Sequence, residues 1–94
     1  MKKIIENYEV DTTTQNIKGH YDLNLIVGNK YEIHYGIHQG IYEYVGKSIK
    51  NLDFPDFGGG QHLFKECISG KITFGYFGTN SPFEFTRIVK PYKD

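Results

Sequence analysis

The stretch NKYEIHYGIHQGIYEYVG, residues 29–46, alternates apolar and polar side chains with a period of two. Side chains along a β-strand point to opposite faces in turn, so this alternation is typical of a strand that buries one face. A helix would instead need apolar residues three and four positions apart, and no such stripe persists along the chain. The stretch therefore predicts two strands joined by a short loop that contains Gly36 and Gly40.

The aromatic residues of this hairpin set its expected register. We expect Tyr35 to pair with Tyr42, and Ile33 to pair with Tyr44, so that the apolar side chains gather on one face. A slip of one residue would put the tyrosines of one strand beside Glu43. The tyrosine-bearing face is thus predicted to belong to the core, rather than to a surface on which nucleic-acid bases stack.

A second hairpin is expected in HLFKECISGKITFGYFG, residues 62–78. Ser69 and Gly70 fit a two-residue turn in which glycine supplies a positive φ angle. Counting outward from that turn places Cys67 opposite Ile72, as a small inward-facing residue. Both faces of this hairpin are then partly apolar, which favours a central place in a sheet that is covered on both sides.

The segment PFEFTRIVKP, residues 82–91, is expected to form the last strand. Its alternation places Phe83 and Phe85 inward and Glu84 and Thr86 outward. Pro91 is expected to end the strand because proline cannot donate to a ladder of hydrogen bonds.

An earlier strand is expected in LNLIVGN, residues 23–29, where Leu23, Leu25 and Val27 share one face and a Gly-Asn turn follows. The first 20 residues allow more than one interpretation. IIENYEV could be a strand, whereas DTTTQN is either a loop or the end of a strand.

These segments describe one all-β domain that spans residues 1–94, because 94 residues suffice for one hydrophobic core and not for two. Five to six short strands with glycine turns favour a small antiparallel barrel or roll, SH3-like or OB-like, since closure would protect aromatic strand edges. The V-G-x-x-Y sequence from Val27 to Tyr31 resembles the turn and strand entry of SH3-like barrels. That resemblance is architectural and implies no functional residue.

The composition limits the expected partners and location. Eleven basic and eleven acidic side chains cancel, so nucleic acid would have to bind a local patch, such as Arg87, Lys90 and Lys93. The lone Cys67 cannot form an internal disulfide, the N-terminus lacks the apolar core of a signal peptide, and no run is long enough for a membrane helix. We therefore expect a cytoplasmic protein. The lack of alanine, with abundant Ile, Lys, Asn and Tyr, fits an AT-rich bacterial or phage genome.

Patterns for catalysis and metal binding are weak. No G-x-S-x-G elbow surrounds a serine, so we expect neither catalytic residues nor a cofactor. His20, His34, His38 and His62 have no neighbouring cysteine or second pair at metal-ligand spacing, so no metal site is expected. His34 is instead expected to face Glu43 across the first hairpin.

The stretch DFPDFGGGQHLF, residues 53–64, is the main candidate for a binding loop. Three consecutive glycines lose much conformational entropy on folding, which indicates either a backbone angle that only glycine reaches or a close approach to another group. Their N–H groups could form a nest for an anion, although the lysine of a P-loop is missing. A bulge or a flexible connection between strands is the structural alternative. The candidate site residues in this loop and in the turn at residues 78–82 are Asp56, Phe57, Gly58, Gly59, Gly60, Gln61, His62, Thr79 and Asn80.

The sequence favours a binding module over an enzyme. We expect a protein partner that contacts the loops at residues 53–62 and 78–82, as for a phage or mobile-element inhibitor of host defence that occludes its target. A module that holds a small ligand, either a nucleotide or a sugar, is the first alternative. Binding of single-stranded nucleic acid is the second. An exposed strand edge could also pair with a second copy of the chain to form a homodimer.

Overall fold

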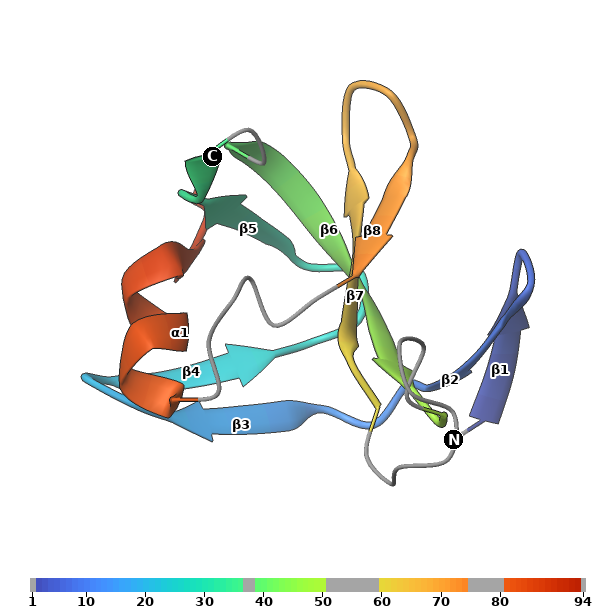
Figure 1. Cartoon of the computed structure of the whole chain (residues 1–94), viewed down its shortest axis with the longest axis horizontal. Helices are drawn as coiled ribbons and strands as arrows, with labels where there is room; N and C mark the ends of the chain where they lie inside the picture. Colours follow the sequence, from blue (N-terminus) through green and yellow to red (C-terminus); the bar gives the residue numbers. More distant parts are fainter. Residues whose placement is uncertain (1, 37–38, 51–59, 75–80, 94) are drawn as a thin grey trace.

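The computed structural model describes residues 2–36, 39–50, 60–74 and 81–93. The elements in these residues, shown in Figure 1, are β1 (Lys2–Ile5), β2 (Tyr8–Asp11), β3 (Gln15–Lys18), β4 (Asp22–Leu25), β5 (Lys30–Ile33), β6 (Gly40–Ser48), β7 (His62–Glu66), β8 (Ile72–Phe74), α1 (Pro82–Ile88) and β9 (Val89–Pro91). The chain is thus mostly β, as the period-two alternation predicts. No helix in these ranges has the length and apolar content needed to cross a bilayer.

The long strand β6 organises the larger sheet. It pairs with β5 near its start and with β2 near its end, whereas β7 pairs with it along most of its length. The resulting order is β1-β2-β6-β5-β9, with β7 and then β8 attached to β6, and all of these pairs are antiparallel. β3 and β4 form a separate two-stranded sheet. Neither sheet closes on itself among the described strands, so the closed SH3-like or OB-like barrel is not seen in them.

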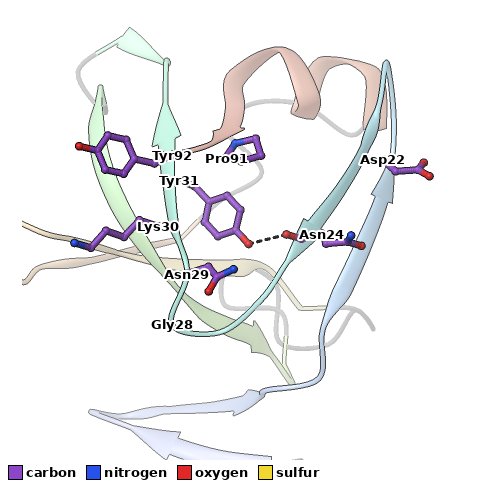
Figure 2. Close-up of a pocket in the computed structure, with 8 residues that line it drawn as sticks. All are labelled: Asp22, Asn24, Gly28, Asn29, Lys30, Tyr31, Pro91 and Tyr92. Atoms are coloured by element: carbon purple, nitrogen blue, oxygen red, sulfur yellow. Dashed lines mark hydrogen bonds between the residues drawn. The ribbon is translucent and has the colours of Figure 1, made fainter. Parts of the chain in front are cut away.

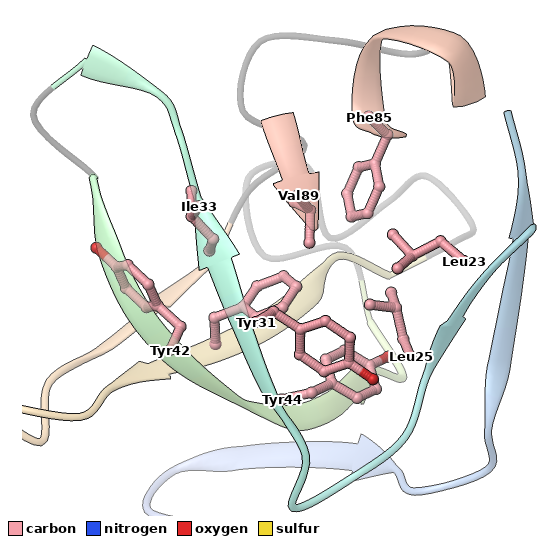
Figure 3. Packing of buried hydrophobic residues seen from close by; sticks show 9 residues of the cluster. Leu23, Leu25, Tyr31, Ile33, Tyr42, Tyr44, Phe85 and Val89 are labelled. Atoms are coloured by element: carbon pink, nitrogen blue, oxygen red, sulfur yellow. The ribbon is translucent and has the colours of Figure 1, made fainter. Parts of the chain in front are cut away.

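The main core lies between β5, β6, β7 and β9 of the larger sheet on one side and β4 and α1 on the other (Figure 3). Its buried members are Leu23, Leu25, Tyr31, Ile33, Tyr42, Tyr44, Phe64, Phe85 and Val89. Both strands of the tyrosine hairpin therefore turn their rings inward, as predicted from the alternation. A smaller cluster, formed by Val10, Val45 and Leu63, lies apart from this core.

The predicted register of the tyrosine hairpin is wrong by four residues. Tyr31, not Tyr35, lies opposite Tyr42, and Ile33 lies opposite Gly40. Beyond Ile33 the pairing with β6 ends, whereas the other edge of β5 stays with β9, where the N–H of His34 donates a hydrogen bond to the carbonyl of Ile88 at 2.8 Å. A shift by an even number of residues keeps every side chain on its predicted face, which explains why the predicted core survives the wrong pairing.

The polar face of this hairpin also differs from the prediction. Glu43 faces Lys30 and, on its other side, Lys65, rather than His34. Opposite charges placed directly across antiparallel strands stabilise the pairing. His34 is exposed.

The second hairpin has a longer turn than predicted. The pairing Leu63–Phe74 and Lys65–Ile72 leaves the four residues 67–70 in the turn, where the N–H of Gly70 donates to the carbonyl of Glu66 at 2.8 Å. Cys67 is consequently exposed at this turn instead of facing Ile72 in the core. The prediction that β7 has apolar residues on both faces is confirmed. Leu63 lies in the smaller cluster, and Phe64, which follows it on β7, lies in the main core.

Residues 82–88 form a helix, not the predicted strand. Ser81 caps it, since its hydroxyl accepts a hydrogen bond from the N–H of Phe83, and Pro82 occupies its first turn. Helical spacing buries Phe85 and Thr86 together, whereas Phe83 is 54% exposed. The predicted inward place of Phe83 and outward place of Thr86 are therefore both wrong. The strand part of the prediction holds only for β9, which ends at proline as expected.

The N-terminal region contains more strand than the sequence indicated. IIENYEV spans parts of both β1 and β2, which form a hairpin whose turn places Glu6 at a φ of 55°. DTTTQN includes the last residue of β2, a connection, and the first two residues of β3. Leu23 and Leu25 of β4 are fully buried, as predicted.

Candidate functional site

The structure describes only part of the predicted binding loop. Of the candidate residues, Gly60, Gln61 and His62 lie in the described ranges. The remaining candidates, Asp56, Phe57, Gly58, Gly59, Thr79 and Asn80, lie outside them. The proposal that the loops at residues 53–62 and 78–82 bind a partner therefore stays a prediction.

Gly60 and Gln61 lie against Ser48 at the end of β6. A Cβ atom on residue 60 would overlap the carbonyl of Ser48, so the last glycine of the run serves a close backbone approach. The N–H of Gln61 donates to the Ser48 hydroxyl and the N–H of Ser48 donates to the Gln61 carbonyl, both at 2.8 Å. Gln61 is 4% exposed. The glycine at position 60 thus has a structural explanation.

His62 is mostly enclosed by aromatic side chains. Its Nδ1 atom lies 3.0 Å from the Tyr44 hydroxyl, and its ring centroid is 5.4 Å from that of Phe85. Burial, with a smaller contribution from the charge of Lys47, lowers the pKa of His62 to about 4. Burial also raises the pKa of Tyr44. Both groups are therefore neutral at pH 7, and the imidazole contributes to packing rather than to a charged site.

The other histidines do not form a site with His62 in the described residues. The ring of His20 packs edge-on against Phe83, with centroids 5.2 Å apart. In the parts of the chain that the structure describes, no three His, Cys, Asp or Glu side chains are grouped so that they could hold a metal ion. His38 lies outside the described residues.

A groove of about 470 Å³ opens between β4 and β5 (Figure 2). These strands are consecutive and joined by a tight turn, in which Gly28 has a φ of +93° and the N–H of Asn29 donates to the carbonyl of Ile26. They nevertheless belong to different sheets, so they diverge from this turn and leave a space between them. The residues that line the groove are Asp22, Asn24, Gly28, Asn29, Lys30, Tyr31, Pro91 and Tyr92.

Tyr31 fixes the two walls of this groove relative to each other. Its hydroxyl donates to the carbonyl of Asn24 at 2.6 Å and accepts from the N–H of Ile26 at 2.8 Å. Burial raises the pKa of Tyr31, so the hydroxyl stays protonated and keeps both bonds. A side chain of β5 thereby satisfies backbone groups on the free edge of β4.

We expect Tyr31→Phe to lower the free energy of unfolding by about 1–3 kcal/mol, because it leaves two partly buried backbone groups without a partner. Urea denaturation followed by circular dichroism would measure the loss. Tyr92→Phe is the matched control, since the Tyr92 hydroxyl has no partner among the described residues, and we expect a change within about 0.5 kcal/mol. Equal losses in the two variants would contradict the bridging role of Tyr31.

The turn between β7 and β8 is a second distinctive surface and projects from the body of the fold (Figure 1). Ile68, at this turn, is 97% exposed. At the base of the hairpin, Lys30, Glu43 and Lys65 form a row of alternating charge across three neighbouring strands. A cavity of about 270 Å³ on this face is lined by Lys30, Glu43, Lys65, Glu66 and Cys67.

Sequence reasoning missed both the groove and the projecting turn. The Gly28-Asn29 turn was expected, but nothing in its residues indicates that the strands on either side diverge. A four-residue turn at residues 67–70 was compatible with the sequence, because it pairs two polar residues of opposite charge, Glu66 and Lys71, at the base of the turn. Searches of protein-family models, of curated proteins and of solved structures found no match to this chain.

Proposed function

We propose that this protein is a non-enzymatic binding module that recognises another protein. Its contact surface is the projecting turn at residues 67–70 together with the charged row Lys30, Glu43 and Lys65. The observation that supports the proposal most is the exposure of Ile68, whose aliphatic side chain is 97% accessible at the tip of a hairpin.

The chemistry of this surface fits a protein partner. Ile68 adds nothing to the core of the isolated protein, yet its burial in an apolar pocket of a partner would contribute about 1.5–3 kcal/mol. Protein interfaces commonly combine such an apolar anchor with a polar rim that excludes water and sets the orientation. The charged row beside the turn supplies that rim, and a partner with the complementary order of charges would align with it.

The expected result of Ile68→Asp is a loss of partner affinity of at least about tenfold, because a charge would replace the apolar anchor. A photoreactive crosslinker attached to Cys67, the single cysteine of the chain, would capture the partner at the neighbouring position. Mass spectrometry identifies the captured protein, and surface plasmon resonance then measures its affinity for each variant.

Two control variants separate this surface from general effects. Ile4→Asp and Ile49→Asp place the same charge at two other exposed isoleucines, which are 67% and 42% accessible. Both should retain the partner if Ile68 is the anchor. A partner that binds wild type and Ile68→Asp equally, or a crosslinker at Cys67 that captures no specific protein, would count against the proposal.

A further inference from the structure

The outer edge of β3 is open among the described strands. β3 pairs only with β4 within them, and Figure 1 shows its other side at the border of the molecule. An unpaired strand edge is a template for another strand, so proteins usually block it. We propose that the outer edge of β3 pairs antiparallel with the same edge of a second copy of this chain, so that the small sheets of the two copies join.

The backbone groups of Asn16 and Lys18 point away from β4. On β4, the Asn24 carbonyl and the Ile26 N–H bind the Tyr31 hydroxyl, so the backbone at these positions faces away from β3. Asn16 lies opposite Asn24, and the backbone groups of two opposite residues in an antiparallel pair point either toward each other or both away. Asn16, and Lys18 two residues later, therefore present their N–H and C=O groups on the outer edge, where no described residue binds them.

The other strand edges are blocked by features that β3 lacks. On β4, the Tyr31 hydroxyl occupies the edge groups. On β9, Pro91 has no N–H to donate, and the Tyr21 hydroxyl donates to the Val89 carbonyl at 2.8 Å. β1 carries two adjacent lysines, and β8 is only three residues long. Of these edges, β3 is the least protected.

The side chains of β3 complement each other in one register. With Ile17 opposite Ile17 of the second copy, Asn16 lies opposite Lys18 of the second copy, and these outward-facing residues exchange N–H···O=C bonds. Each half-buried Ile17 then covers the other, and each lysine meets an amide. Pairing Lys18 with Lys18 would instead set like charges together, and pairing Asn16 with Asn16 would set Ile17 opposite Gln15.

Sedimentation equilibrium from about 10 µM to about 1 mM tests the proposal, with a reducing agent that keeps Cys67 from linking two copies. Wild type should pass from monomer to dimer in this range, because a contact through one short strand is weak. Asn16→Pro removes an outward N–H that the β3–β4 pairing does not use, and it should raise the dimer dissociation constant by at least about tenfold. Asn16→Ala is the matched control. It loses the same side chain and its hydrogen bond to Asn24 but keeps the N–H, so we expect a change within about twofold.

A cross-linking experiment decides the question even if Asn16→Pro does not fold. In the register above, the two Ile17 residues form a pair without mutual hydrogen bonds, whose Cα atoms lie about 4.5 Å apart, within the range of a disulfide. Ile17→Cys in a Cys67→Ser background should therefore form a disulfide-linked dimer on oxidation. Asn7→Cys in the same background changes an exposed residue outside β3 and should form much less of it.

The proposal is wrong if wild type stays monomeric up to about 1 mM, if Asn16→Ala weakens the dimer as much as a folded Asn16→Pro, or if Asn7→Cys cross-links as readily as Ile17→Cys. It is independent of the protein-partner proposal, because the turn between β7 and β8 lies on the opposite side of the molecule from β3 in Figure 1. Ile68→Asp should leave dimerisation unchanged, and Asn16→Pro should leave partner capture at Cys67 unchanged.

Discussion

Phe64→Ala is expected to lower the free energy of unfolding by about 3–5 kcal/mol. Phe64 is fully buried, and its ring centroid lies 6.3 Å from that of Tyr31, 6.5 Å from that of Tyr42 and 5.4 Å from that of Tyr44. Truncation to alanine would remove three aromatic contacts and leave a cavity among rings that cannot easily close it. Since small domains are stable by only about 5–15 kcal/mol, this single change could remove most of the stability.

Chemical denaturation at pH 7, followed by circular dichroism, would measure this effect. Phe83→Ala is the matched control because it removes the same side chain from a site that is 54% exposed on α1. The control should cost about 1 kcal/mol or less, mainly from the edge-on contact with His20. A loss for Phe83→Ala as large as that for Phe64→Ala would mean that the core is not centred on β5, β6 and β7.

The core residues could be predicted from the sequence because the period-two alternation determines which face of a strand each side chain occupies, whatever residue it pairs with on the next strand. Tyr31, Ile33, Tyr42 and Tyr44 lie on one face in any register that is shifted by an even number of residues. The exact pairing depends on where the chain leaves β6. β5 also pairs with β9, which lies far along the chain, and no local pattern reports a pairing of that kind.

The helix at residues 82–88 was missed although a local signal was present. Ser81, Pro82 and Glu84 have the spacing of a capping box with proline in the first turn. The alternation of Phe83 and Phe85 competed with that signal, and over so few residues a period of two cannot be distinguished from helical spacing. The structure resolves the ambiguity by burying the adjacent Phe85 and Thr86, which a strand with one buried face would not do.

The candidate site could be predicted only in part. The glycine run was expected to serve a special backbone angle or a close approach, and the approach of Gly60 to Ser48 is of the second kind. The binding role assigned to this loop stays a prediction. The groove between β4 and β5 could not be foreseen, because a tight turn between two strands usually joins partners in one hairpin. The exposure of Ile68 was missed because the predicted two-residue turn left that residue within a strand.

The stability of the protein should fall by about 3 kcal/mol as the pH is lowered from 7 to 4, because His62 stays neutral in the folded state while the unfolded state takes up a proton. Its pKa is about 4 when folded, against 6.5 for an unperturbed histidine. The unfolded state therefore takes up the proton first, so stability is lost progressively below about pH 6.5, and the loss levels off only below pH 4, where the folded state is protonated as well. Hydrogen bonds from Thr13 lower the pKa of the Asp11 carboxyl to about 2, so protonation of Asp11 reduces stability only at a lower pH than this range.

Urea denaturation at a series of pH values between 7 and 4 would measure this slope. His62→Gln lowers stability at pH 7 through the lost contacts with Tyr44 and Phe85, but it should flatten the dependence on pH because it removes the buried titrating group. His34→Gln removes an exposed histidine and should keep the wild-type slope. If His62→Gln kept that slope too, the imidazole would have to be accessible to protons in the folded state. His62 would then be available to a ligand, as the glycine-loop prediction required.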